Sequence, residues 1–178
     1  FIDAFGYPFC RGRILSTIEC DKGQYDDARY VFWASGACLV VRTDAFRELG
    51  GFDSDFFAHM EEIDFCWRAQ LAGWRIAIEP RSRVYHLGAG TLAAKTPRKI
   101  YLNFRNTLFT LYKSLSPRSR AITIFTRMFL DGWSAFVYLV SGRPQLLKSV
   151  WQAHRDYRRA KPGLKIKRRE IMQTRKQK

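Results

Sequence analysis

The sequence predicts an α/β domain of short mixed strands and helices, followed by amphipathic α-helices. Three observations lead to this class. The apolar run 32–42 ends in β-branched residues and is typical of a buried strand. Apolar side chains recur every three or four residues over 58–72, which predicts a helix with one buried face. After Pro117 the chain is first strongly apolar and then basic, and we expect amphipathic helices there.

Turn-forming residues and charges dominate residues 1–30, where we expect a loop-rich and partly exposed segment. After the strand, Thr43 is expected to cap a short helix. That helix should end at Gly50 and Gly51, because glycine tolerates the left-handed conformation in which many helices end.

Further helices and strands are expected downstream. The helix of 58–72 should end at Gly73, and short strands should follow at 75–78 and 83–86. A threonine and a proline then begin another helix, which is expected over 97–113.

The apolar segment 121–140 contains Arg127 and Asp131, which a membrane span would have to bury at a cost of about 2.5–3.5 kcal/mol each. A helix lying in the membrane plane avoids that cost, and the alternative is a helix packed on the domain core. The aromatic side chains that suit a membrane interface are Phe125, Phe129, Trp133, Phe136 and Tyr138. A second helix is expected over 145–160, with a frayed basic end from Lys161.

Length and composition indicate one packed core, because 47% of the 178 residues are hydrophobic and 15% are aromatic. The four cysteines form no Cys-x-x-Cys pair, which favours a reducing, cytosolic environment over a zinc or redox site. The chain begins at Phe1 without methionine, and we interpret it as a fragment. It has no run of eighteen uncharged apolar residues, so a simple membrane span is not expected.

The formal charge of +15 is concentrated at the C-terminal end. Residues 141–178 contain thirteen Lys or Arg and two acids, and so supply +11 of the total. Such a tail can bind nucleic acid or the anionic lipid of a cytoplasmic leaflet. The sequence has no helix-turn-helix, zinc-finger or RNA-recognition pattern, so nucleic acid is not an expected partner.

Three carboxylates, Glu61, Glu62 and Asp64, gather at the start of the predicted helix over 58–72. Two interpretations compete. In one, the acids favour the positive end of the helix dipole and Asp64 pairs with Arg68 one turn later. In the other, a carboxylate is held at a cleft as a general base. Spacing alone favours the first.

Four motifs occur in order between residues 34 and 91. They are SGACLVVR at 35–42, FRELGGFDSDFF at 46–57, EEIDFCWRAQLAGW at 61–74 and VYHLG at 84–88. Together they resemble glycosyltransferase family 2, whose members have a GT-A nucleotide-sugar fold and include inverting enzymes. YLNFRN at 101–106 is also similar to the Arg-Asn helix of that family. The resemblance covers about a third of the chain.

The resemblance implies which acid acts. In the family a Glu-Asp pair usually opens the third motif, and its second acid is the base that takes the acceptor proton. Glu62 holds that position here, one methylene longer than the usual aspartate. Glu61 is the second candidate. Asp64 is placed with the substrate-binding candidates, although support of the loop or helix is the simpler role for it.

The resemblance also implies residues that bind substrates and metal. Gly36 and Ala37 lie in the first motif, where a side chain in place of the glycine would block the sugar or acceptor pocket. Trp33 is a candidate for stacking on a sugar, and Arg105 for contacting the diphosphate. His86 is the expected ligand of a divalent metal ion, Mn²⁺ or Mg²⁺, and an imidazole suits Mn²⁺ better. Each of these residues also has an ordinary structural interpretation.

The family's nucleotide-binding half, with its Asp-x-Asp metal motif, is expected upstream of Phe1. Asp53-Ser54-Asp55 has these letters but follows a glycine turn instead of a strand. We therefore interpret residues 1–115 as the acceptor-side half of a GT-A domain and 116–178 as a basic, membrane-associating helical region. The chain alone is expected to have little transferase activity.

The sequence favours a metal-dependent inverting glycosyltransferase at the cytoplasmic face of the plasma membrane. Its expected partners are a nucleotide-diphosphate sugar, a glycan or polyprenyl-linked acceptor of cell-surface polysaccharide synthesis, and an anionic membrane surface. Two alternatives stay open: a nucleic-acid-binding or anionic-surface-binding module built on the tail, and a non-catalytic transferase remnant.

Overall fold

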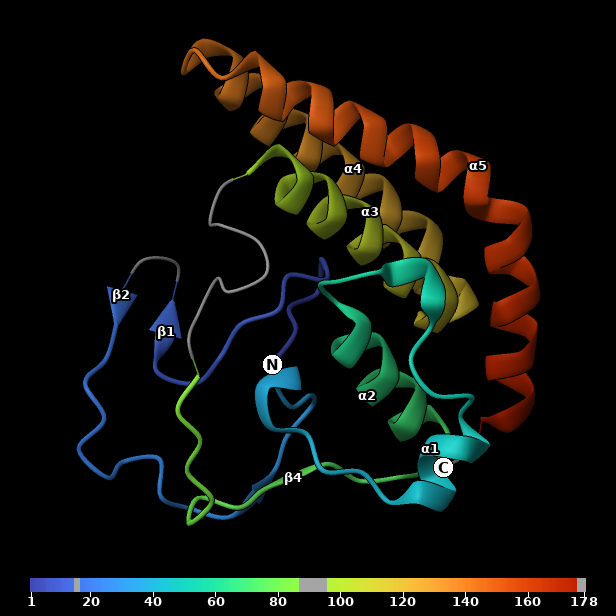
Figure 1. Cartoon of the computed structure of the whole chain (residues 1–178). Helices are drawn as coiled ribbons and strands as arrows, with labels where there is room; N and C mark the ends of the chain where they lie inside the picture. The colour runs from blue at the N-terminus through green and yellow to red at the C-terminus, as the bar shows by residue number, and fades with distance from the viewer. Residues whose placement is uncertain (15–16, 87–95, 176–178) are drawn as a thin grey trace.

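The computed structural model describes residues 1–14, 17–86 and 96–175, and helices dominate it (Figure 1). The α-helices are α1 (Thr43–Glu48), α2 (Glu61–Leu71), α3 (Pro97–Ser114), α4 (Pro117–Val140) and α5 (Pro144–Thr174). Two single-turn 3-10 helices are η1 (Gly36–Cys38) and η2 (Ser54–Phe56). The strands are β1 (Arg13–Ile14), β2 (Thr17–Ile18), β3 (Arg29–Tyr30) and β4 (Ala77–Ile78). The chain therefore combines helices with short strands, as the α/β class requires.

The strands form two small antiparallel sheets. β1 pairs with β2, and β3 pairs with β4 so that Arg29 faces Ile78 and Tyr30 faces Ala77. The second sheet ties the segment before α2 to the segment after it. β4 confirms the strand expected at 75–78, shortened to two residues.

Two expected strands are wrong. Segment 32–42 is irregular around the turn of η1, and Val40 within it is 92% exposed. Residues 83–86 are also irregular. A strand needs a neighbour to satisfy its backbone groups, and none of the described strands pairs with either segment. Apolar, β-branched sequence alone cannot supply that neighbour.

The boundaries of the short helices agree with the glycine signals but not with the expected cap. Arg42, and not Thr43, is the N-cap residue of α1, and it makes no side-chain capping hydrogen bond. After α1, Gly50 and Gly51 have φ angles of 71° and 67°, the left-handed conformation that glycine favours. Gly73 ends α2 in the same way, with a φ of 90°.

The three long helices group together on one side of the molecule (Figure 1). α3 packs against α2, α4 and α5. The expectation that the chain frays after Lys161 is wrong, because α5 continues to Thr174. The side chains of Leu164 and Ile171 are buried, with 1% and 9% of their surface exposed, and their packing holds the last part of this helix in place. α5 changes direction along its length in Figure 1, as the proline inside it, Pro162, predicts.

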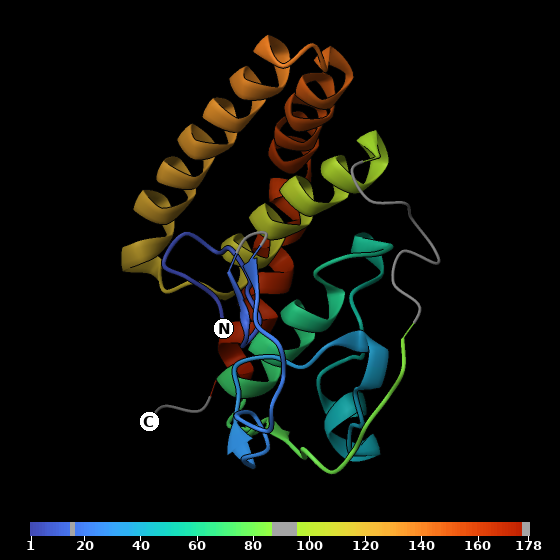
Figure 2. The same cartoon turned by 90° about the vertical axis from the view of Figure 1, so that its left-hand side faces the viewer.

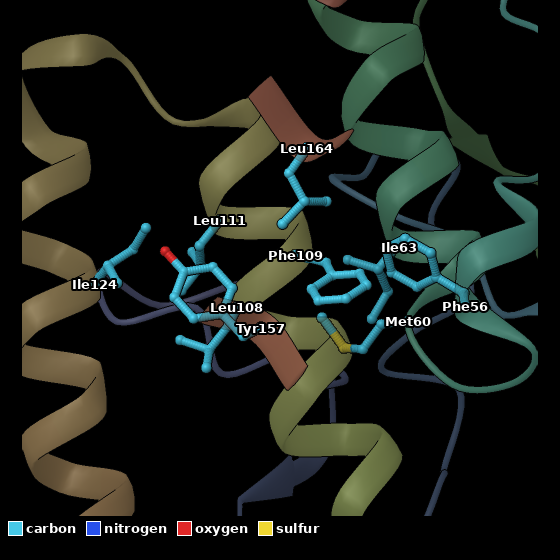
Figure 3. Close-up of a cluster of buried hydrophobic side chains, with 9 residues drawn as sticks. All are labelled: Phe56, Met60, Ile63, Leu108, Phe109, Leu111, Ile124, Tyr157 and Leu164. Carbon is cyan, nitrogen blue, oxygen red and sulfur yellow. The ribbon is translucent and has the colours of Figure 1, made fainter. Parts of the chain in front are cut away.

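One hydrophobic core joins the helices (Figure 3). Its buried members are Phe56, Met60, Ile63, Leu108, Phe109, Leu111, Ile124, Tyr157 and Leu164. They come from η2, from α2 and the residue before it, and from α3, α4 and α5. The core therefore draws on both sides of the predicted boundary at residue 115, and that division stays a prediction.

Among the described residues, no helix combines the length and the hydropathy that crossing a bilayer requires.

Candidate active site

The loop that leads into α2 has an unusual backbone. Phe57, His59 and Met60 have φ angles of 62°, 67° and 72°, although none of them is a glycine. A non-glycine residue in this region costs on the order of 1–3 kcal/mol, and such residues persist only where their surroundings hold them. Strain of this kind directly before the acidic turn marks the start of α2 as a candidate active site.

Two neighbouring residues of α3 hold the loop. The side-chain amide of Asn106, which is fully buried, donates to three loop carbonyls, those of Phe56 (3.0 Å), Ala58 (2.9 Å) and His59 (2.7 Å). The guanidinium of Arg105 donates to the carbonyl of Asp55 at 2.7 Å and to the Asn106 side chain at 2.9 Å. These hydrogen bonds offset the cost of the strained conformation. In this structure Arg105, a candidate for contacting the diphosphate, is engaged with the loop.

A buried ionic network lies behind the loop. The ammonium of Lys113, 1% exposed, lies 2.6 Å from an oxygen of Asp53 and 2.8 Å from an oxygen of Asp64. Arg68 bonds the other oxygen of Asp64 at 2.9 Å and donates to the carbonyl of Gly51 at 2.7 Å. Burial acts to raise the pKa of Asp53, but Lys113, Lys167 and the backbone N–H of Asp55 together outweigh it, and the pKa falls to about 2.

The network shows what Asp64 does in this structure. Its side chain is 0% exposed, and both of its oxygens are engaged by cations from α2 and α3. The expected pair with Arg68 one turn later is present, and a role of Asp64 in substrate binding stays a prediction. The contacts of Asp64 connect the glycine turn after α1, α2 and α3.

Glu62 occupies the first turn of α2 beside η1. A Cβ built on Gly36 would lie 3.9 Å from the Cβ of Glu62, so the structure brings these two predicted site residues together. Oε2 of Glu62 is buried and has no hydrogen-bond partner among the described residues. Burial raises the pKa of Glu62, and the charge of Glu61 adds to the increase, while the backbone of Gly36 opposes it. A buried carboxylate with a free oxygen and a raised pKa can accept a proton from a ligand.

His59 and Glu61 lie beside this carboxylate on the same turn of chain. Within the described part of the chain, Nε2 of His59 and Oε2 of Glu61 are also buried without a partner. Burial lowers the pKa of His59, and the nearby charge of Lys99 lowers it further, against the opposing effect of Glu61. The imidazole is therefore neutral near pH 7, and the turn offers polar atoms of both residues to a ligand.

A cavity of about 610 Å³ borders η1, and neither Gly36 nor Glu62 lines it. Its lining is largely apolar and includes Trp33, Ala37, Cys66 and Trp74. The indole nitrogen of Trp33 donates to the carbonyl of Phe1 at 2.8 Å, which fixes the ring in the wall. Cys66 lies one turn after Glu62 on α2 and so connects the cavity wall to the candidate base. Burial raises the pKa of the Cys66 thiol, and the charge of Glu62 raises it further.

The described residues do not provide a metal site. His86 is exposed, and the motif residues that follow it, Leu87 and Gly88, lie outside the described residues. Across residues 1–14, 17–86 and 96–175, no group of three or more His, Cys, Asp or Glu side chains is arranged to hold a metal ion. His86 as a metal ligand therefore stays a prediction.

Sequence reasoning assigned no role to three residues that shape this site: His59, Asn106 and Lys113. A polar Arg-Asn pair inside an otherwise apolar helix was a signal that α3 faces something polar. The lysine also interrupts an apolar stretch. No sequence signal indicated the left-handed backbone at His59, because it depends on hydrogen bonds from a helix about fifty residues away.

The fold and the acid pair of α2 are those of a glycosyltransferase domain. The family model described as "Glycosyl transferase family group 2" matches residues 24–148, which is well over half of the chain. The chain belongs to this family. The match confirms the resemblance drawn from the four motifs and the α/β, GT-A-like class. No solved structure matches the chain.

Named relatives share its central part. The chain is 45% identical over 58 residues to an N-acetylglucosaminyl-diphospho-decaprenol L-rhamnosyltransferase of Mycobacterium tuberculosis, a stretch that covers 33% of this chain and 19% of the relative. It is 24% identical over 123 residues to the low-salt glycan biosynthesis hexosyltransferase Agl10 of Haloferax volcanii, covering 68% and 40%. It is 38% identical over 56 residues to the rhamnosyltransferase WbbL of Escherichia coli, covering 32% and 21%. The chain thus spans less than half the length of each of these relatives.

Proposed function

We propose that this chain carries the catalytic base of an inverting glycosyltransferase and that Glu62 is that base. One observation supports this most strongly. The Glu62 carboxylate is buried beside Gly36, has an oxygen free of protein partners among the described residues, and has a raised pKa. A buried carboxylate oxygen without a partner is costly, so one beside a strained loop in this family favours a functional role.

The proposed reaction is a one-step displacement. The acceptor oxygen forms a bond to the anomeric carbon of the donor sugar while the bond from that carbon to the diphosphate breaks. The electron pair of the broken bond leaves with the nucleoside diphosphate, and the acceptor proton moves to a carboxylate oxygen of Glu62. Burial assists this step because it raises the proton affinity of the carboxylate. His59, whose imidazole is neutral, lies on the same turn as Glu61, and both are proposed to orient the acceptor.

The donor and acceptor are proposed from the relatives. The names of the relatives include rhamnosyltransferases, a hexosyltransferase and a decaprenol-linked acceptor. For this chain we propose a nucleotide-diphosphate hexose or deoxyhexose donor and a polyprenyl-linked glycan acceptor of cell-surface polysaccharide synthesis. With a lipid-linked acceptor, the enzyme is proposed to work peripherally at the cytoplasmic face of the membrane.

A divalent metal ion, Mn²⁺ or Mg²⁺, stays part of the proposal, and when bound it would neutralise the diphosphate leaving group. The described residues of this chain do not form its site, so no step above depends on it. Because the chain covers only 19–40% of the relatives, we propose that a nucleotide-binding half completes the enzyme and that this chain alone has little transferase activity.

The test compares Glu62→Gln with Glu61→Gln in the complete enzyme, with transfer measured from a nucleotide sugar to a polyprenyl-linked acceptor. Glutamine keeps the shape of the side chain but cannot accept the proton, so Glu62→Gln should lower kcat by about 10²–10⁴-fold. Glu61→Gln should cost much less, because that residue only borders the reaction. Near-normal transfer by Glu62→Gln would show that the base lies elsewhere.

A further inference from the structure

The exposed face of α4 is apolar over its whole length. Its large hydrophobic side chains recur at spacings of three and four and are 51–75% exposed: Ile122, Phe125, Phe129, Trp133, Phe136 and Val140. We call this set the α4 aromatic row. Spacings of three and four place all six on one side of a helix. A continuous apolar row of this size on a monomer marks an interaction surface.

Two charged residues in the middle of α4, Arg127 and Asp131, lie on its opposite face and point into the protein. Arg127 and Asp131 are 4% and 0% exposed and pair at 2.7 Å. Asp131 also lies 3.1 Å from Nε2 of His154 on α5, and the Arg127 guanidinium stacks over the ring of Tyr7 at 3.8 Å. Polar contacts thus hold α4 on the domain while the aromatic row faces outward, the reverse of an ordinary water-facing helix.

Of the two alternatives for segment 121–140, the structure shows core packing, and the in-plane helix stays a proposal. α4 packs on the core through Ile124, and its aromatic row remains exposed at the same time. Tyr138 is the exception among the expected interfacial aromatics, because it packs inward against a second cluster around Phe104 and Val150. The helix can therefore dock on a surface without releasing its buried charge pair.

We propose that the α4 aromatic row is a docking surface for an anionic lipid bilayer, with α4 lying in the plane of the interface. Phe and Trp side chains favour the boundary between headgroups and acyl chains. The charge of the chain matches such a partner, since it is +15 overall. Exposed basic residues also flank the row at both ends of the helix, Arg118 before it and Arg143 after it. An apolar row together with basic charge supplies the two signals that stable peripheral binding needs.

The position of α4 suits this role. Figure 2 shows α4 along the left edge of the molecule, and the segment with η1 and α1 lies on the opposite side. α3 packs against both α2 and α4 and so connects the docking helix to the helix that carries Glu62. The row would bind a bilayer whether or not Glu62 is the base, so the two proposals can fail separately.

The test measures co-sedimentation of the chain with vesicles of phosphatidylcholine containing one quarter phosphatidylglycerol, and with vesicles of phosphatidylcholine alone. The variant is Phe129→Gln with Trp133→Gln, and its helix content is checked by circular dichroism. Ile166→Gln on α5 is the matched control, because Ile166 is also apolar and 56% exposed but lies outside the row. Sedimentation velocity without lipid reports the oligomeric state of each protein.

The unmodified chain should bind the anionic vesicles, bind neutral vesicles more weakly, and lose affinity as salt rises. The double variant should bind at least about tenfold more weakly, because two aromatic side chains no longer enter the interface. Ile166→Gln should bind normally. Equal binding by the double variant would overturn the proposal, since the basic tail alone would then account for binding. A dimer that dissociates in the double variant, with no vesicle binding by the unmodified chain, would assign the row to a protein interface instead.

Discussion

Replacing Asn106 with alanine should destabilise the loop that leads into α2, the helix that carries Glu62. The side-chain amide of Asn106 serves three carbonyls at 2.7–3.0 Å and accepts a hydrogen bond from Arg105 at 2.9 Å. Three residues of that loop have a left-handed backbone, so alanine would remove the contacts that offset their strain. The variant tests whether α3 holds the acidic turn in place.

The expected loss follows from these contacts. A hydrogen bond contributes about 0.5–1.5 kcal/mol net, and a buried group left without a partner costs about 1–3 kcal/mol. Because two amide protons are shared among three carbonyls, and water can enter the loosened loop, we expect a total loss of ~2–4 kcal/mol in the free energy of unfolding.

The assay is urea unfolding of the chain, followed by tryptophan fluorescence. Asn103→Ala is the matched control, since Asn103 lies one turn earlier on α3 and is only half-buried. Its loss should stay below about 1 kcal/mol. If Asn106→Ala costs no more than Asn103→Ala, the amide does not hold the loop and the reasoning fails. In the complete enzyme, Asn106→Ala should also lower kcat because the base is displaced.

Three further predictions concern the same site. Burial raises the folded-state pKa of Glu62, so ionisation of this carboxyl costs stability as pH rises through that pKa. Glu62→Gln should therefore raise the thermal midpoint at pH 8 and leave it unchanged below pH 4. An equal effect at both pH values would contradict this. Lys113→Met leaves Asp53 and Asp64 without their shared cation and should cost about 3–5 kcal/mol in urea unfolding, whereas exposed Lys165→Met should cost little. Gly36→Ala should leave stability near normal, because the added Cβ makes only an ordinary 3.9 Å contact. Gly36→Leu should lower sugar transfer by the complete enzyme about tenfold or more, because the larger side chain crowds Glu62. Full activity of Gly36→Leu would count against the placement of Gly36 beside Glu62.

Several features of the fold could be predicted from sequence because local chemistry determines them. The three-and-four periodicity of α2, the Thr-Pro start of α3, and the glycines at 50, 51 and 73 located helices and their ends. The order and spacing of the four motifs were enough to indicate the family. These signals work because side-chain spacing and left-handed glycine depend on only a few neighbouring residues.

The failures share a physical cause. Segment 32–42 has the composition of a strand, but composition does not provide a hydrogen-bonding partner, and the described structure leaves it irregular. α5 extends past Lys161 because Leu164 and Ile171 are buried by packing against segments distant in the sequence. The local basic sequence does not reveal this packing. Both errors arise where a non-local contact, or its absence, overrides local preference.

The sequence by itself determined the family, the positions of the acids, and the concentration of positive charge at the C-terminal end. Only the tertiary structure decided what each polar group faces. It placed Asn106 against carbonyls 47 to 50 residues away, and Lys113 against an acid 60 residues away. It turned Arg127 and Asp131 of α4 inward and the α4 aromatic row outward. Those outcomes depend on packing between distant segments, because a buried charge or strained turn persists only where another element supplies its partner.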